Sequence, residues 1–399
     1  PSFFSNRYRD EKKMLQVIAA IFIVIFFIPY TASGFAACGK LFSSLFGVKY
    51  LTAMIISAIV IVAYTTLGGF LAASTTDFIQ SIIMSVALIV VLIFGVETAG
   101  GISAVIHNAS ELPGYLSMTL SYDVNTGKAA PYSALTIVST AAWGLGYFGM
   151  PHILLRFMAI EDEKKLKLSR RVATIWVVIS LFVAVFIGVI GYTMSKVGAL
   201  EMLTGSNSET IIVKISALLS QHGVIFALLA GVILAGILAS TMSTSDSQLL
   251  AASSAVSSDI LGAFRKDSSN KNGSMAAARI TLLVISVVAA FIARNPDSSV
   301  FAIVSFAWAG FGAAFGPVVL FSLFWKRTSK WGALAGMVCG GSMVFIWKYL
   351  IRPLGGIWNI YELLPAFLIA CAAIVIVSLL TPKPSKEIEE EFDRVAQMK

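Results

Sequence analysis

The chain has 399 residues, of which 57% are hydrophobic and 13% are charged, and its mean hydropathy is +0.86. Since a soluble domain carries about a quarter charged residues, this composition excludes an ordinary soluble globular protein. The net charge of +8 could indicate nucleic-acid binding. However, the basic residues stand between apolar runs, which indicates membrane topology, and we expect no nucleic-acid partner.

Apolar runs long enough to cross a bilayer recur along the whole chain. A crossing helix takes about 20 residues, and backbone groups inside lipid must be paired within their own segment, so the runs predict helices. The sequence predicts an all-α polytopic membrane protein with a transmembrane domain over 1–381 and a cytoplasmic tail over 382–399. The ten predicted spans are 14–37, 48–68, 77–98, 132–155, 172–196, 210–252, 278–294, 298–325, 331–351 and 360–381.

The basic residues also predict which side of the membrane each loop faces. Ten spans place both ends of the chain on one side, and assigning that side to the cytoplasm puts 21 of the 29 Lys and Arg residues there. The positive-inside rule therefore predicts cytoplasmic ends in a multi-pass protein of the cell membrane. The longer loops, 99–131 and 197–209, are then external, and 259–277 is a cytoplasmic linker.

Polar residues inside a span are costly, so they mark candidate sites. Asp77 opens the third span, directly after Ser74, Thr75 and Thr76. It is either a site carboxylate in the cytoplasmic half of the membrane or a residue at a helix N-terminus that the helix dipole stabilises. The sequence leaves both interpretations open.

The fourth span contains three glycines and a proline between Trp143 and His152. This composition disfavours a continuous helix, and broken helices of this kind expose backbone dipoles at the membrane midplane in transporters with inverted repeats. Trp143 and Tyr147 would offer apolar faces with one hydrogen-bonding tip each. The alternative is a glycine kink with interfacial aromatic residues. We interpret His152 as a boundary residue rather than a proton carrier.

The sixth span, which is long enough to include a non-spanning lead-in, carries four hydroxyl residues at i, i+3, i+4 and i+7, one face of a helix. They are Ser240, Ser243, Thr244 and Ser247. Sodium prefers oxygen ligands, by the logic that gives calcium and magnesium oxygen shells. The alternative is packing by interhelical hydrogen bonds. Asp246, beside them, is either a site carboxylate or a residue at the cytoplasmic mouth.

The remaining features indicate packing rather than chemistry. Gly312 and Gly316, in the eighth span, form a small-xxx-small pair that allows close helix contact. Ile388, Phe392 and Val395 have the spacing of a short amphipathic helix in the tail. The three cysteines and three histidines are dispersed, so we expect neither a disulfide framework nor a metal cluster.

Two stretches resemble signatures of the sodium:solute symporter family. The first, from Tyr64 to Ala72, reads YTTLGGFLA. The second runs from Arg327 to Gly340, although Ser342 departs from its small apolar ending. The chain is similar to the proline-carrying members over essentially its whole length. The stretches that carry this similarity are WGLGYFGMPHILLRFMA, the MST of the sixth span and FAWAGFGAAFGPVVLFS.

The resemblance implies the five-plus-five inverted-repeat fold of the leucine-transporter type. Ten transmembrane helices of that fold are expected in this chain. About three more are expected before Pro1, including the broken first core helix that supplies the other half of the sodium and substrate sites.

The resemblance also implies site residues. Sodium is expected at the hydroxyls of Ser243 and Thr244 and at the backbone carbonyl of Ser240. A possible second sodium region contains Asp77, Asp246 and Ser247. Asp246 stands where the family more often has a hydroxyl or apolar residue. The positions linked with substrate binding are Tyr30, Trp143, Tyr147 and Pro151.

The predicted function is sodium-coupled symport of L-proline into the cell by alternating access. Trp143 and Tyr147 would form the apolar wall for the proline ring. Sodium is the transported coupling ion, and no other cofactor is expected. The expected partners are proline, sodium and the lipid bilayer, and the sequence does not predict an oligomeric state.

Other functions compete with this prediction. Within the family, the solute could be pantothenate, a sugar, sialic acid or another amino acid, and protons could replace sodium because Asp77 and Asp246 can titrate. A transporter-like membrane sensor is a second class, which the tail without a kinase-like segment argues against. A membrane enzyme is a third, but the spans contain no HExxH and no GxSxG.

Overall fold

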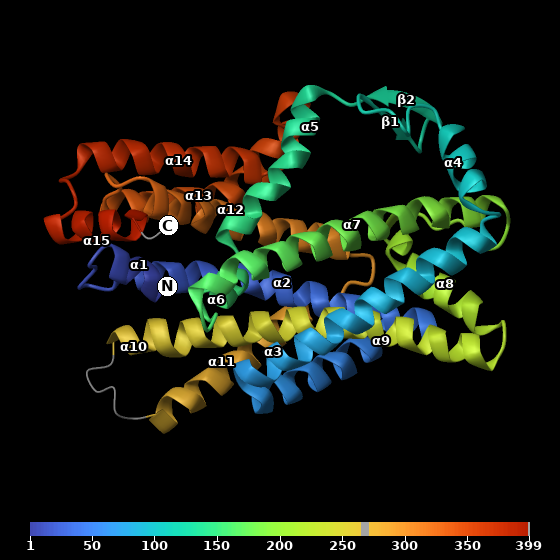
Figure 1. Ribbon diagram of the computed structural model, residues 1–399, viewed down its shortest axis with the longest axis horizontal. Helices are drawn as coiled ribbons and strands as arrows, with labels where there is room; N and C mark the ends of the chain where they lie inside the picture. Colours follow the sequence, from blue (N-terminus) through green and yellow to red (C-terminus); the bar gives the residue numbers. More distant parts are fainter. Residues whose placement is uncertain (265–270, 398–399) are drawn as a thin grey trace.

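The computed structural model describes residues 1–264 and 271–397, apart from the side chains of 67–73, 264 and 271–274. The described part of the chain is mostly helical, and its long helices lie side by side along the long axis of the molecule (Figure 1). The first and last helices lie at one end of this axis, and α4 and α8 lie at the other (Figure 1).

The N-terminal half contains most of the short elements. Its helices are α1 (Ser2–Arg7), α2 (Met14–Phe46), α3 (Tyr50–Thr98), α4 (Ile102–Ser110), α5 (Ala134–Ala141), the 3-10 helix η1 (Ala142–Gly149), α6 (Pro151–Met158), η2 (Glu163–Lys165), α7 (Leu166–Lys196), η3 (Gly205–Thr210) and α8 (Ile211–Ser220). Its strands are β1 (Leu120–Asp123) and β2 (Lys128–Pro131), an antiparallel pair in which Leu120 faces Pro131 and Asp123 faces Lys128.

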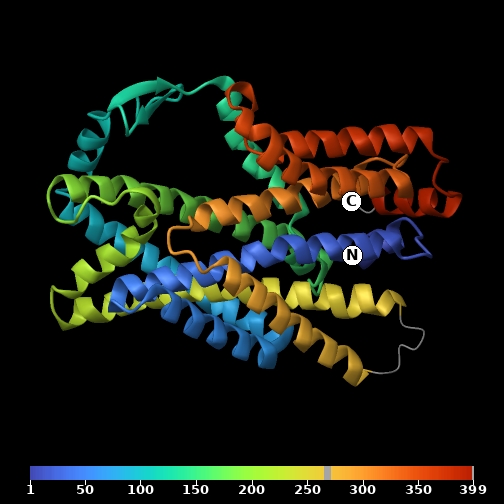
Figure 2. The ribbon, with the colours of Figure 1, turned by 180° about the vertical axis from the view of Figure 1, so that it is seen from behind.

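The C-terminal half is built from longer helices. They are α9 (Val224–Ser254), the π-helical turn η4 (Ala255–Ile260), α10 (Leu261–Phe264), α11 (Lys271–Ile292), α12 (Val300–Phe324), α13 (Lys330–Ile346), η5 (Trp347–Ile351), η6 (Arg352–Leu354), η7 (Gly356–Trp358), α14 (Leu363–Leu380) and α15 (Lys386–Gln397). Seen from behind, α2 runs between α9 and α11 on one side and α12 to α14 on the other (Figure 2).

Eight helices in the described ranges are long and apolar enough to cross a membrane. The predicted second span corresponds to a shorter apolar helix, Tyr50–Thr66, and the predicted fourth span is divided among α5, η1 and α6. Every predicted span thus falls on helical segments. Ten crossings remain a prediction, as do the helices expected before Pro1.

The segment 69–76, which lies between the second and third predicted spans, is helical, because α3 is continuous from Tyr50 to Thr98. In a straight helix Tyr64 and Asp77 would lie about 20 Å apart. Tyr64, however, bonds to Asp246 on α9, and Arg156 connects Asp77 to the adjacent Ser247. The two parts of α3 therefore converge on one turn of α9. The side chains of 67–72 in the first signature lie outside the described residues.

Two apolar cores hold the helices together. The larger contains α2, α12, α13 and α14, and every residue of α12 from 306 to 319 is buried. The smaller contains the C-terminal part of α3 together with α7, α8 and the start of α9. Outward-facing residues of α7 are also apolar, with Ile175, Phe182 and Val185 between 62% and 72% exposed. Such a surface suits contact with lipid.

Serine side chains fix where several helices begin. Ser133, Ser299 and Ser329 each precede a helix and accept a hydrogen bond from the backbone N–H three residues later, at 3.1, 3.2 and 3.0 Å. This capping satisfies an N–H group that has no partner within the helix. It sets the starts of α5, α12 and α13.

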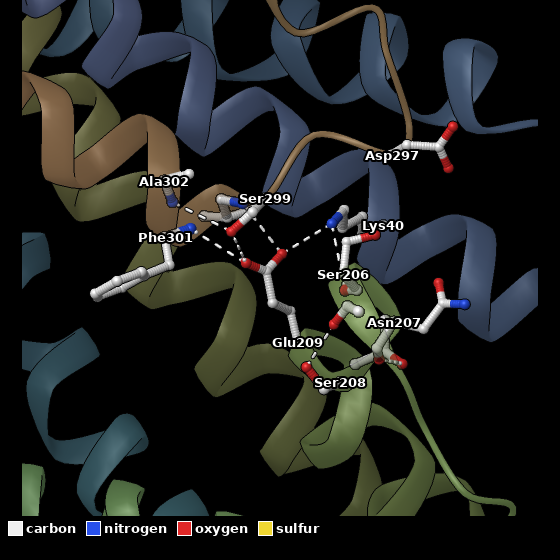
Figure 3. A network of polar contacts seen from close by, with 12 residues as sticks. Lys40, Ser206, Asn207, Ser208, Glu209, Asp297, Ser299, Phe301 and Ala302 are labelled. Atoms are coloured by element: carbon white, nitrogen blue, oxygen red, sulfur yellow. Dashed lines mark hydrogen bonds and ion pairs between the residues drawn. The ribbon is translucent and has the colours of Figure 1, made fainter. Parts of the chain in front are cut away.

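A polar network ties η3 to α2 and to the start of α12 (Figure 3). The Glu209 carboxylate accepts from Lys40 Nζ and Ser299 Oγ, both at 2.8 Å, and from the Val300 and Phe301 amides at 3.1 and 3.2 Å. A carboxylate here also meets the positive end of the α12 helix dipole. Glu209 therefore joins three elements through four donors.

The loops and the tail contain more structure than the sequence predicted. The loop 99–131 holds α4 and the β-hairpin, and the linker 259–277 is helical wherever it is described, with residues 265–270, including Arg265 and Lys266, outside the described ranges.

The amphipathic tail helix is confirmed as α15, with Ile388 buried but Val395 55% exposed. Ion pairs at 2.8 and 2.5 Å connect α15 to Arg9 and to Lys326. Both ends of the chain therefore lie on the same side of the bundle.

Candidate functional site

The predicted hydroxyl ladder lies on α9, and its four residues are half-buried. Ser243 Oγ and Thr244 Oγ1 each donate a hydrogen bond to the carbonyl oxygen of Ser240, at 3.0 Å. Three uncharged oxygens are thus gathered on one turn of the helix. A hydroxyl oxygen that donates its hydrogen keeps its lone pairs, so this group can present oxygen ligands to a hard cation.

Asp246 lies inside the bundle, next to this group. It is fully buried. The Tyr64 hydroxyl donates to Asp246 Oδ2 at 2.8 Å and lies 3.1 Å from the carbonyl oxygen of Met242. Asp246 Oδ1 has no hydrogen-bond partner in the part of the chain that the structure describes. This burial favours a site carboxylate over a residue at an open cytoplasmic mouth.

Asp77 and Ser247 are joined by a residue that the sequence had assigned to a cytoplasmic loop. Arg156 lies in the last turn of α6, and its Nη2 donates to Asp77 Oδ2 and, at 2.9 Å, to Ser247 Oγ. Asp77 is in the interior of α3 rather than at a helix N-terminus. The helix-dipole interpretation of Asp77 is therefore wrong, because α3 begins 27 residues earlier, at Tyr50.

A cavity of about 270 Å³ opens beside this cluster. Its polar lining residues are Ser74, His152, Arg156, Ser247 and Ser254, and its apolar ones are Leu155, Leu250 and Ala251. The cavity therefore lies between α3, α6 and α9 and connects the Arg156 cluster with His152.

The break in the fourth span is confirmed. α5 gives way to η1, Met150 is extended with φ −77° and ψ 108°, and Pro151 begins α6. Two glycines allow η1 to touch α12. A Cβ at Gly146 would lie 1.9 Å from Trp308 Nε1, and one at Gly149 would lie 2.2 Å from the carbonyl oxygen of Phe311.

Gly312 contributes to the same contact from α12. A Cβ there would lie 2.8 Å from the Cα of Gly146. Gly316 faces Phe367 of α14, 2.8 Å from the position of such a Cβ. The predicted close packing through this glycine pair is therefore confirmed, and its partners are η1 and α14.

The predicted substrate residues form two adjoining groups. Trp143 stacks on Trp308 at 5.2 Å between ring centres, and Tyr147 meets the same ring edge-on at 4.8 Å. The Trp308 indole N–H donates to the Trp143 carbonyl at 2.9 Å. The ring of Tyr30 on α2 packs edge-on against the ring of His152, next to Pro151, with 6.1 Å between the ring centres.

His152 lies inside the bundle rather than at its boundary. Its ring also packs 5.8 Å from Phe27. The buried Nδ1 has no hydrogen-bond partner among the residues that the structure describes.

Three residues of the site were not predicted as such: Tyr64, Arg156 and Trp308. The sequence placed Trp308 in a stretch that indicated packing and Arg156 in a loop rich in basic residues. Tyr64 was noted only as part of the first family signature. A cationic residue directly after a broken apolar span is the one signal that could have identified Arg156.

The bundle thus combines a helix that carries a row of hydroxyl groups with a broken helix. A family comparison agrees: residues 1–340 match the description of the Sodium:solute symporter family. The chain belongs to the sodium:solute symporter family. Members of this family are transporters rather than enzymes.

Curated relatives of this family member share more than a third of its residues. It is 40% identical over 400 residues to the sodium/proline symporter of Haemophilus influenzae, covering 99% of this chain and 76% of that protein. It is 38% identical over 386 residues to the osmoregulated proline transporter OpuE of Bacillus subtilis, covering 97% and 75%. The Salmonella typhimurium sodium/proline symporter is 38% identical over 393 residues, covering 98% and 74%.

A solved structure shares the fold of this symporter. It is a substrate-bound, outward-open state of a Na⁺-coupled sialic acid symporter, described as revealing a novel Na⁺ site. The TM-score is 0.74 at 17% sequence identity, over 96% of this chain and 78% of the other. At this identity the likeness establishes the fold alone.

Proposed function

We propose that this protein carries L-proline into the cell together with sodium. The observation that carries this proposal is the hydroxyl pair of Ser243 and Thr244, which converges on the Ser240 carbonyl in a chain related to sodium/proline symporters. Transport by this route needs no covalent chemistry, and sodium is cargo rather than a resident cofactor.

The sodium ion binds at Ser240, Ser243 and Thr244. The ligands are the hydroxyl oxygens of Ser243 and Thr244 and the backbone carbonyl of Ser240. Because all three groups are uncharged, they hold a monovalent cation weakly enough to release it in each cycle. Their half-burial leaves the face of α9 accessible to an ion.

The solute binds beside the break in the fourth span, at Tyr30, Trp143, Tyr147 and Pro151. Trp143 and Tyr147, packed on Trp308, offer an apolar wall to the pyrrolidine ring. The interruption of the helix between η1 and α6 would offer backbone dipoles to the charged ends of a zwitterion. One apolar side and one polar side match the chemistry of proline.

Sodium binding stabilises the state that accepts proline from outside, and closure then occludes both ligands. Alternation between two states with different ligand affinities is sufficient for coupling. The five-plus-five inverted repeat supplies the moving halves of such a mechanism. The protein lies in the plasma membrane with both ends cytoplasmic, because basic residues are concentrated on that side.

Uptake of radiolabelled proline by cells that express the protein tests this function. We expect uptake to rise with external sodium at fixed pH, and unlabelled proline to compete more strongly than pantothenate, glucose, sialic acid or alanine. The matched control is the same strain without the protein. Absence of proline uptake, or stronger competition by another solute, would show that proline is not the preferred solute. Uptake that depends on pH but not on sodium would show that the coupling ion is the proton rather than sodium.

A further inference from the structure

The second candidate cation region already contains a positive charge. The Arg156 guanidinium donates through one nitrogen to the Asp77 carboxylate on α3 and to the Ser247 hydroxyl on α9. These are two of the three residues from which a second sodium site was predicted. Both acceptors are hard oxygen ligands, and both lie on helices other than the one that supplies the arginine.

One positive charge is enough to balance the carboxylate of Asp77. Arg156 carries a positive charge that is present at every physiological pH, and it forms an ion pair with Asp77. A sodium ion that shared Asp77 Oδ2 and Ser247 Oγ with the guanidinium would be repelled at close range. Asp246, the third residue of the second candidate region, instead accepts from the Tyr64 hydroxyl at Oδ2, 2.8 Å away, and its Oδ1 has no hydrogen-bond partner among the described residues.

Resting on the proposed function, we propose that the Arg156 side chain is a tethered cation that holds the second sodium position. While it is in place, Asp77 and Ser247 bind no sodium, and the protein binds one sodium ion at Ser240, Ser243 and Thr244. Arg156 thereby sets the number of ions bound with each solute molecule.

The two members of the ion pair differ in their freedom to move. The Asp77 side chain is 10% exposed, whereas the Arg156 side chain is 44% exposed and lines the cavity of about 270 Å³. Removal of the guanidinium would therefore leave a buried carboxylate and a hydroxyl next to a space that water and ions can enter. Those are the ligands and the access that a sodium site requires.

Equilibrium binding of radioactive sodium to the purified protein tests this inference, since it does not require transport. We expect about one sodium per protein molecule in the wild type and about two in Arg156→Gln, at saturating sodium. Arg156→Lys keeps the charge and should bind about one. The double variant Arg156→Gln with Asp77→Asn removes both charges and should also bind about one.

Asp77→Asn alone provides a second test if Arg156→Gln does not fold. The inference predicts that this variant keeps the stoichiometry and the sodium affinity of the wild type. Two sodium ions in the wild type that fall to one in Asp77→Asn would overturn the inference. So would a single sodium in a folded Arg156→Gln protein.

The two proposals fail in different ways. Absence of saturable sodium binding in the wild type would count against the proposed sodium symport. Sodium-dependent uptake together with the wrong stoichiometries would leave the symport intact and remove only the role of Arg156.

Discussion

Two regions of the bundle each pair a carboxylate with a basic side chain, but the carboxylate oxygens have hydrogen-bond partners to different extents. Glu209 receives four donors from α2 and the start of α12, and Lys40 balances its charge (Figure 3). In the inner cluster, Arg156 pairs with Asp77 and the Tyr64 hydroxyl donates to Asp246, and one oxygen of each carboxylate has no partner within the described ranges.

Glu209 therefore stabilises the fold, whereas the oxygens of Asp77 and Asp246 that have no partner among the described residues can take part in ion binding. A carboxylate with all its hydrogen bonds made gains nothing from a further ligand, whereas buried oxygens without partners are costly. Substitutions in the outer network, around Glu209, should therefore affect stability. Substitutions in the inner region, which contains Asp77, Asp246 and the hydroxyl ladder of α9, should affect ion binding. Variants in each region test this division.

The largest effect is expected for Thr244→Ala in the inner region. Loss of one of three sodium ligands should raise the sodium concentration for half-maximal uptake about thirtyfold, or about 2 kcal/mol, with normal expression. Thr241→Ala is the matched control, because its hydroxyl also donates to a carbonyl one turn earlier on α9, at 3.0 Å. Equal sodium dependence in wild type and Thr244→Ala would remove this residue from the sodium site.

A smaller effect, on stability alone, is expected for Lys40→Met in the outer network. The Lys40 side chain is 11% exposed, so its loss leaves Glu209 charged and partly buried, at a cost of about 1 to 2 kcal/mol. Thermal unfolding in detergent measures this loss. Lys214→Met is the control, since Lys214 and Glu201 pair at 2.8 Å with 36% and 65% exposure and should contribute at most about 0.5 kcal/mol.

A change in the sodium requirement of uptake in Lys40→Met would contradict this division. That result would place the outer network in the transport cycle. An equal loss of stability in the Lys40 and Lys214 variants would instead show that burial of the Glu209 network contributes nothing beyond a surface ion pair.

The smallest effect is a pH dependence. Burial raises the pKa of Glu209, but hydrogen bonds from Lys40, Ser299 and the amides of Val300 and Phe301 outweigh it, and the pKa lies below the ordinary 4.5. A carboxyl group with a lowered folded-state pKa adds stability above its unfolded pKa and loses it as pH falls through the folded value.

Melting temperature should therefore decline more steeply below about pH 4.5 in the wild type than in Glu209→Gln, which lacks the titrating group. Parallel curves for the two proteins would show that Glu209 titrates alike in the folded and unfolded states.

Local patterns in the sequence predicted the features that depend on neighbouring residues. The hydroxyl face of α9 follows from the helical repeat, and the break before Pro151 follows from glycine and proline chemistry. The same reasoning left residues 69–76 between two predicted spans, yet the backbone there is helical, because a few Ser and Thr residues weaken a helix without ending it.

Contacts between distant residues could not be predicted in this way. Tyr64 and Asp246 are 182 positions apart, and Arg156 and Asp77 are 79 apart. The spacing of residues in a sequence gives the direction of a side chain on its own helix and does not identify the helix that it meets. Arg156 therefore looked like one more basic residue of a cytoplasmic loop.

The stacked indoles beside the broken helix have a spectroscopic consequence. Trp143 and Trp308 lie 5.2 Å apart with their planes 13° from parallel, one on η1 and the other on α12. Chromophores this close absorb as a coupled pair, and their near-ultraviolet circular dichroism depends on their mutual angle. The near-ultraviolet circular dichroism of this pair therefore reports any shift between η1 and α12 without an attached label.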